Sequence, residues 1–154
     1  EIRLELDLSD RLANLAPEGF DLAIRHTATP PETHVAWALC ESRSLLVASR
    51  DYLRRHGTPQ HPQDLASHAC LLYLRDGGSQ AWSFEQERRR RPERVDVAIS
   101  GPFKANNSEV LREAVLAGLG VGLLPDFTAA SAMASEGRES ISTCRPDTSK
   151  TIRA

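Results

Sequence analysis

This chain lacks a long apolar run, a secretion signal and paired cysteines. No apolar stretch approaches the length needed to span a bilayer, so we expect no membrane-spanning helix. The first five residues carry neither a starting Met nor the apolar core of a signal peptide, which predicts that residue 1 lies within a longer chain. The cysteines are odd in number and lack paired spacing, which favours reduced thiols and a cytoplasmic location: Cys40, Cys70 and Cys144.

Composition indicates a soluble globular protein. The 154 residues are 40% hydrophobic and 26% charged, a length that fits one domain or two small lobes. A net charge of −2 argues against nucleic-acid binding through bulk charge. One basic run, 88–91 with Arg94, is flanked by glutamates, and no aromatic residue lies between its arginines. This pattern favours a solvated hairpin tip over a nucleic-acid patch.

The first 25 residues predict a strand, a helix and a second strand. Apolar and charged residues alternate over 2–8, the period of a half-buried strand. Ser9 can cap a short helix that Pro17-Glu18-Gly19 would end. Residues 20–25 are mostly apolar and predict another strand. This order implies a right-handed crossover in a parallel sheet.

The rest of the chain continues the α/β alternation to residue 125. Strands are predicted at 44–48, 70–74, 82–84, 95–99 and 119–125. Ser49 should begin a helix that ends at Gly57, and 63–67 predict a helical turn. A further helix is predicted over 110–118, with Asn106 as its N-cap and a C-cap at Gly118. Residues 135–154 are polar without periodicity, which predicts a disordered tail.

Two positions could bind a small anion. A helix that opens with Asn106, Asn107 and Ser108 presents backbone N–H groups suited to an anion or a carbonyl, although every helix start has such groups. Arg25 ends a predicted strand, where its guanidinium could hold a carboxylate in bidentate fashion. An ion pair with Asp21 or Glu18 is the alternative, and the sequence leaves both open.

No pattern supports a metal, a cofactor or catalysis. The glycines at 118, 120 and 122 follow a predicted helix and precede a strand, the reverse of a dinucleotide-binding loop. His61, His68 and Cys70 match no zinc spacing and lack a fourth ligand. No nucleophile elbow is present. We therefore expect no catalytic residue, no metal ligand and no cofactor.

Five blocks resemble, in order, the regulatory domain of LysR-type transcriptional regulators, and together they cover about residues 2–130. Arg50 is a small departure, since the family often has proline there. The blocks are 4–12 with 18–25 (EGFDLAIR), 46–59 (LVASRDYLRRHGTP), 61–71 (HPQDLASHACL), the Asn106-Asn107 helix start, and 116–125 (LAGLGVGLLP).

The resemblance implies an α/β, two-lobed, type 2 periplasmic-binding-protein-like fold. It places a partial lobe I at 1–43, lobe II at 44–134 and a polar tail at 135–154. The strand and helix that open lobe I in the family are absent here. The tail occupies the sequence position at which the chain of other family members returns to lobe I.

The resemblance also implies a function. A small effector, often an organic anion, would bind between the lobes of a homodimer or tetramer, and DNA would be bound only through a winged helix-turn-helix outside this chain. A free-standing small-anion-binding protein of the same fold is the alternative; an enzyme on this scaffold would need a catalytic constellation that is not found. The implied ligand-binding residues are Ser9, Arg25, His26 and Thr27 from lobe I and Asn106, Asn107, Ser108 and Phe127 from lobe II.

Overall fold

The computed structural model of the chain describes residues 2–9, 13–25, 32–74, 80–88, 91–135 and 141–143. The chain divides into two compact units, 1–42 and 43–154. The first unit contains α1 (Leu15–Glu18). The elements of the second unit are β1 (Ser44–Ser49), α2 (Arg50–His56), the 3-10 helix η1 (Pro62–Ser67), β2 (Cys70–Tyr73), β3 (Ala81–Arg88), β4 (Arg91–Ala98), β5 (Phe103–Ala105), α3 (Ser108–Leu116), β6 (Val121–Pro125), α4 (Asp126–Ser135) and β7 (Ile141–Thr143).

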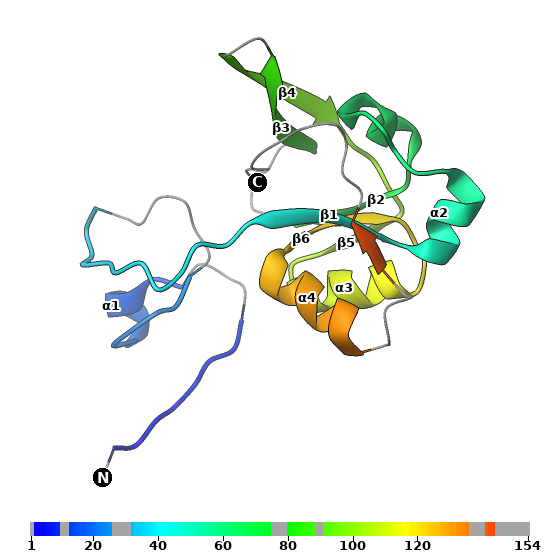
Figure 1. The fold of residues 1–154 in the computed structure, drawn as a ribbon. Coiled ribbons are helices and arrows are strands. Elements are labelled where there is room, and N and C mark those ends of the chain that lie inside the picture. The colour runs from blue at the N-terminus through cyan, green and yellow to red at the C-terminus, as the bar shows by residue number, and fades with distance from the viewer. Residues whose placement is uncertain are drawn as a thin grey trace. The chain divides into compact units, whose positions relative to one another are not determined.

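The second unit is built on a mixed sheet with the order β5-β2-β6-β1-β7 (Figure 1). Strands β5, β2 and β6 run parallel, and Leu71 lies between Phe103 and Gly122 in the register. Strand β1 is antiparallel to both β6 and β7. The β3–β4 hairpin forms a separate two-stranded sheet.

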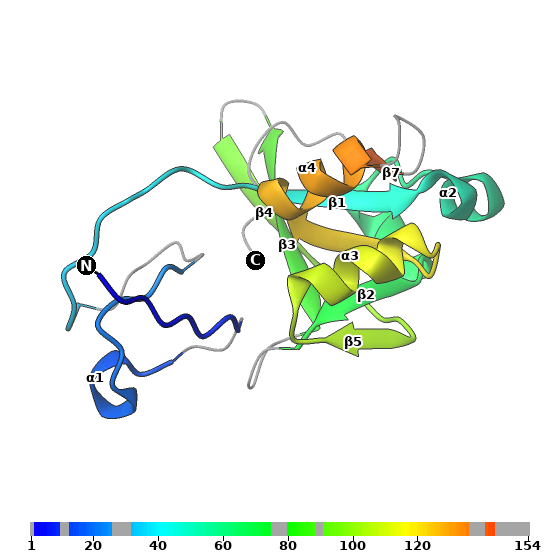
Figure 2. The same ribbon diagram turned by 90° about the horizontal axis from the view of Figure 1, so that it is seen from below.

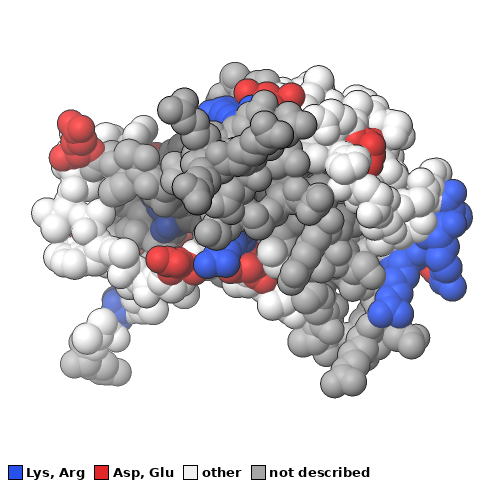
Figure 3. Space-filling model, turned by 45° about the horizontal axis from the view of Figure 1, so that its top comes forward, with Lys and Arg blue, Asp and Glu red and all other residues white. Residues whose placement is uncertain are grey.

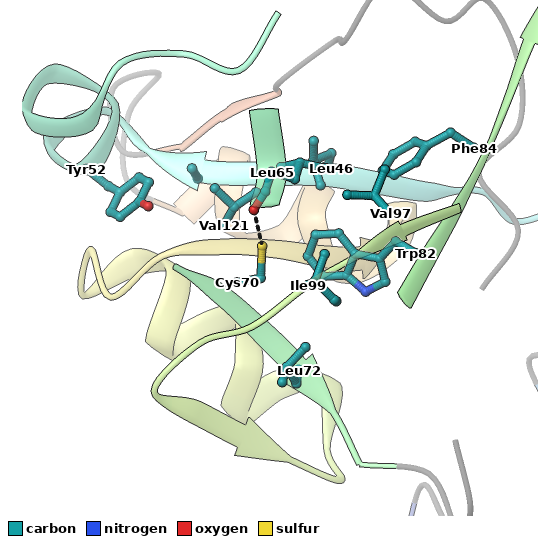
Figure 4. Packing of buried hydrophobic residues seen from close by; sticks show 11 residues of the cluster. Leu46, Tyr52, Leu65, Cys70, Leu72, Trp82, Phe84, Val97, Ile99 and Val121 are labelled. Atoms are coloured by element: carbon teal, nitrogen blue, oxygen red, sulfur yellow. Dashed lines mark hydrogen bonds between the residues drawn. The ribbon is translucent and has the colours of Figure 1, made fainter. Parts of the chain in front are cut away.

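Alternating side chains divide the core of this unit into two layers, as the two-residue period of a strand requires. Along β1, Leu46 and Ala48 belong to one buried cluster and Val47 to the other. The first cluster includes Trp82 and Phe84 of the hairpin, and Figure 4 shows both rings beside the sheet residues. Both faces of the sheet are therefore covered by apolar side chains.

Helices α3 and α4 pack on the second face, as Figure 2 shows. Leu111, Ala114 and Val115 of α3 are buried there. A Cβ at Gly122 of β6 would lie 2.7 Å from Val115 Cγ2, so the absence of a side chain lets the helix approach the sheet closely. Gly118, with φ +73°, ends α3 by donating to the Val115 carbonyl at 2.9 Å.

Most predictions for the second unit are confirmed. The predicted strands correspond to β1, β2, β3, β4 and β6, and the predicted helices to α2, η1 and α3. Ser49 caps α2, since its Oγ accepts from the Tyr52 N–H at 3.2 Å, and Gly57 ends that helix. Strand β5 and helix α4 were not predicted from the sequence. Within the segment predicted to be a tail, Ile141–Thr143 form β7 and pair with Val47–Ser49.

The strand predictions for the first unit are wrong. Residues 2–9 and 20–25 form no strand, and no parallel crossover occurs there. Ile2 is 93% and Ile24 is 78% exposed. The alternation is real, but an extended segment needs a neighbouring strand to satisfy its backbone groups, and the described residues of this unit provide none. Helix α1 ends at Gly19 as predicted but begins after Asn14; residues 10–12 lie outside the described part.

Across the described residues, no helix is long and apolar enough to cross a membrane.

Candidate functional site

The carboxyl edge of the parallel strands β5, β2 and β6 is the candidate site. In open sheets with parallel strands, ligands bind beyond the carboxyl ends of the strands. Two residues separate the end of β5 from the start of α3, and α4 begins directly after β6, so both helix starts lie at this edge (Figure 2). The edge thus brings together Asn106, Asn107 and Ser108 with Phe127.

Asn107, and not Asn106, is the N-cap of α3. The Asn107 Oδ1 accepts from the Val110 N–H at 3.0 Å, and the residue has extended backbone angles. Glu109 is therefore the second helical residue. The helix thus begins at Ser108, one residue later than an Asn106 cap would place it.

Tyr73, which no sequence motif marks, holds the segment before α3. The Tyr73 hydroxyl, at the end of β2, donates to the Asn106 carbonyl at 2.9 Å. This bond ties the segment between β5 and α3 to the neighbouring strand. Only the pairing of β2 with β5 makes it possible, so no local sequence signal marks it.

Asp126 organises the start of α4. Its Oδ1 accepts from the Phe127 N–H at 2.9 Å, and its Oδ2 accepts from the Arg43 N–H at 3.2 Å. The Phe127 side chain is 59% exposed, and Leu74, directly after β2, is 51% exposed. The edge therefore presents apolar side chains beside polar helix starts, a combination typical of small-molecule sites.

The four ligand-binding residues predicted in the first unit do not form a site in the part of the chain that the structure describes. The Arg25 guanidinium donates to the Ala13 carbonyl, which is neither a ligand nor either of the acids considered as its partner. Ser9 is exposed and belongs to no strand. His26 and Thr27 lie outside the described residues. The roles of these four residues in ligand binding stay predictions.

A buried polar cluster lies under α2 and η1. The Tyr52 hydroxyl is 3.1 Å from His68 Nδ1 and accepts from the Ala69 N–H at 3.0 Å. Burial, with His56 nearby, lowers the pKa of His68, while burial raises the pKa of Cys70 to about 12. The Cys70 Sγ donates to the Leu65 carbonyl at 3.6 Å (Figure 4). A neutral imidazole and a protonated thiol that bond to their neighbours stabilise packing; they do not form a reactive pair.

Metal-ligating side chains do not gather in the described part of the chain. No group of three or more His, Cys, Asp or Glu residues there could hold a metal ion. Cys144 lies outside the described residues.

Replacing Asn107 with alanine should lower the free energy of unfolding by about 1 kcal/mol, because α3 loses its side-chain cap. Asn106→Ala is the matched control and should have almost no effect, since only its main-chain carbonyl is used. Urea unfolding of both variants measures the difference. Equal losses, or a larger loss for Asn106→Ala, would mean that the cap is not at Asn107.

Comparisons with known proteins agree on one family. The family model described as the LysR substrate binding domain matches residues 1–141. Among curated proteins, the probable HTH-type transcriptional regulator LtrA of Klebsiella pneumoniae is 37% identical over 130 residues, which are 84% of this chain and 41% of LtrA. The HTH-type transcriptional regulator CrgA of Neisseria meningitidis serogroup C is 35% identical over 126 residues, 82% of this chain and 40% of CrgA. The chain thus spans about two fifths of these relatives.

Solved structures give the same result. The structure of CrgA from Neisseria meningitidis has a TM-score of 0.69 at 31% identity, covering 90% of this chain and 45% of that chain. Full-length AphB from Vibrio cholerae has a TM-score of 0.74 at 26% identity, covering 99% of this chain and 48% of the AphB chain. The curated relatives are named as HTH-type transcriptional regulators, which favours the regulator interpretation over the free-standing binding protein. The chain belongs to the LysR substrate-binding domain family, with its periplasmic-binding-protein-like fold.

Proposed function

We propose that this domain binds a small organic anion at the carboxyl edge of β5, β2 and β6 and passes that event on within a transcription regulator. The observation that carries the proposal is the start of α3, with Asn107 as its cap, at the same edge as the exposed Phe127 ring. DNA binding, and with it the choice of target genes, would reside in a part of the regulator outside this domain.

Charge favours an anion at the start of α3 in particular. The first-turn N–H groups of a helix lack helical acceptors and carry partial positive charge. At α4 the Asp126 carboxylate already accepts from the Phe127 N–H. At α3 the cap is an uncharged amide, and the nearby Glu109 carboxylate is 2.7 Å from Arg112 Nη1, which compensates its charge. A ligand carboxylate is therefore favoured at the N-terminus of α3.

The exposed apolar side chains define the rest of the ligand. Phe127 and Leu74 offer carbon surface at the edge. A carboxylate with a short apolar body would bury that surface while its charge meets the α3 N-terminus. The domain would act as a ligand sensor in a homodimer or tetramer in the cytoplasm, without catalysing a reaction.

Thermal unfolding in the presence of small carboxylates tests this proposal. Acetate, succinate and benzoate would each be compared with the corresponding uncharged amide. A bound carboxylate at tenfold its Kd should raise the melting temperature by about 3–5 °C. The amides should have a much smaller effect. Equal shifts for acid and amide would contradict an anion site at α3.

Phe127→Ala separates the apolar contact from charge. It should weaken binding of benzoate about tenfold, because the aromatic body loses a partner, and change that of acetate little. An unchanged affinity for benzoate would remove Phe127 from the site.

A further inference from the structure

A buried histidine, His68, connects helix α2 to the segment between η1 and β2. Its side chain is 9% exposed, and its Nδ1 lies 3.1 Å from the Tyr52 hydroxyl oxygen. The same oxygen accepts from the Ala69 N–H at 3.0 Å. Tyr52 is 3% exposed, and Figure 4 shows its ring projecting from α2 toward the other residues of the first core cluster. The Tyr52–His68 pair therefore joins α2 to the chain that leads into β2.

The hydrogen bonds at the Tyr52 oxygen suit a neutral His68. Because that oxygen already accepts from a main-chain N–H, its own hydrogen can be donated to an unprotonated Nδ1. We therefore assign the proton of the neutral imidazole to Nε2. A second proton would turn Nδ1 into a donor aimed at the same oxygen, and the hydroxyl hydrogen would have to turn away. Protonation of His68 thus weakens the bond to Tyr52.

The surroundings of His68 also oppose a positive charge on it. Burial is the largest effect and lowers the pKa of His68. His56 of α2, whose ring stacks on that of Tyr52 at 4.5 Å between centroids, lowers it further. The Asp64 carboxylate of η1 acts in the opposite direction, but it already accepts two main-chain N–H groups at 2.8 and 2.9 Å. The neighbouring Cys70 thiol stays uncharged, since burial raises its pKa to about 12.

The last turn of α2 adds further positive charge. Figure 3 shows basic surface gathered at the side of the molecule where Figure 1 places α2. Arg54 of this turn pairs with Asp51, and Arg55 Nη2 donates to the Gly118 carbonyl at 3.3 Å. Helix α2 is thus bound to the rest of the unit through the buried Tyr52 and through the exposed Arg55 at the end of α3. Loss of the Tyr52–His68 bond would leave the weaker, exposed contact.

We propose that the Tyr52–His68 pair is an acid-sensitive latch, which holds α2 in place at neutral pH and releases it locally when His68 takes up a proton. A histidine whose pKa is lowered only in the packed state binds its proton more readily where α2 is detached. The stabilisation is therefore complete above the ordinary histidine pKa of 6.5 and is lost as the pH falls below it. This device goes beyond effector binding and does not depend on the site at α3.

Amide hydrogen exchange of the whole chain at about pH 7.5 and about pH 5.5, corrected for the intrinsic rates, tests the latch. The Ala69 N–H reports on the bond to Tyr52, and the Gly57 N–H, which donates to the Leu53 carbonyl at 2.8 Å, reports on the end of α2. Their protection should fall about five- to tenfold in acid, the limit that one pH unit below 6.5 sets. Amides of β1 and β6 should change much less, which distinguishes local release from loss of the fold.

Variants assign the effect to His68. His68→Asn offers an oxygen acceptor to Tyr52 but cannot be protonated, so it should retain protection at neutral pH and lose the dependence on pH. His34→Asn, which removes an exposed imidazole of the first unit, is the matched control and should behave as the original chain does. Tyr52→Phe should lower the protection of Ala69 already at neutral pH.

An NMR titration of the His68 imidazole in the original chain needs no substitution, and its midpoint should lie below 6.5. A midpoint at or above 6.5 would overturn the proposal. So would an equal loss of protection in α2, β1 and β6, or a pH dependence that persists in His68→Asn.

Discussion

Replacing Phe84 with alanine is expected to lower the free energy of unfolding of the second unit by about 3–5 kcal/mol. The ring is fully buried, and it packs with Leu46 and Val97 where the hairpin meets the mixed sheet (Figure 4). Removing the ring deletes apolar contacts and leaves a cavity between the hairpin and the mixed sheet. The melting temperature should fall by about 10 °C or more.

Phe127→Ala is the matched control because it deletes the same atoms from a ring that is 59% exposed. Its effect on unfolding should stay below about 1 kcal/mol. Chemical denaturation followed by tryptophan fluorescence compares the two. Equal losses would show that Phe127 belongs to the core and would remove it from the candidate site.

Gly101→Ala is expected to cost at least about 2–3 kcal/mol, because the methyl group has no room. A Cβ at Gly101 would lie 1.8 Å from the carbonyl oxygen of Cys70. The obstacle is backbone, held in place by the Cys70 N–H that donates to the Ser100 carbonyl at 2.9 Å. Residues 99–101 or the start of β2 would have to move.

The neighbouring Ser100→Ala provides the control, since its side chain is exposed and its main-chain carbonyl is retained. It should leave the melting temperature almost unchanged. Calorimetry of both variants tests the contact. A Gly101→Ala protein as stable as the original would show that Gly101 and Cys70 are farther apart than described here.

Sequence alone predicted most of the second unit because its signals are local. Ser49 and Gly57 bound α2, and Gly118 bounds α3 at its end, each through bonds between residues near in sequence. Strands β5 and β7 have three residues each and depend on pairing with β2 and β1, so a local pattern could not reveal them.

The same reasoning failed in the first unit for a related cause. Alternation over 2–8 correctly marks an apolar face, but strand formation also requires a neighbour to accept its backbone hydrogen bonds. No local pattern supplies that neighbour. Apolar periodicity therefore identified the side chains that share one face of the segment. It did not show that this face is buried.

The residues of the candidate site were chosen from the sequence, and their role in ligand binding stays a prediction. The sequence placed a helix start and Phe127 among the binding residues, and sheet topology now groups them at one edge. The N-cap is Asn107 and not Asn106, so α3 begins at Ser108. Tyr73 belongs to the candidate site because its hydroxyl donates to the Asn106 carbonyl, 33 residues away in the sequence. No sequence motif marks such a bond.

Amide chemical-shift mapping tests the central claim most directly. A uniformly ¹⁵N-labelled chain would be titrated with the carboxylate that stabilises it most, and with the corresponding amide. We predict that the largest saturable shifts occur at the amides of Ser108, Glu109 and Phe127, at the carboxyl edge of β5, β2 and β6, and that the uncharged amide produces much smaller ones. Saturable shifts confined to other parts of the chain, with these three amides unmoved, would contradict an effector site at this edge.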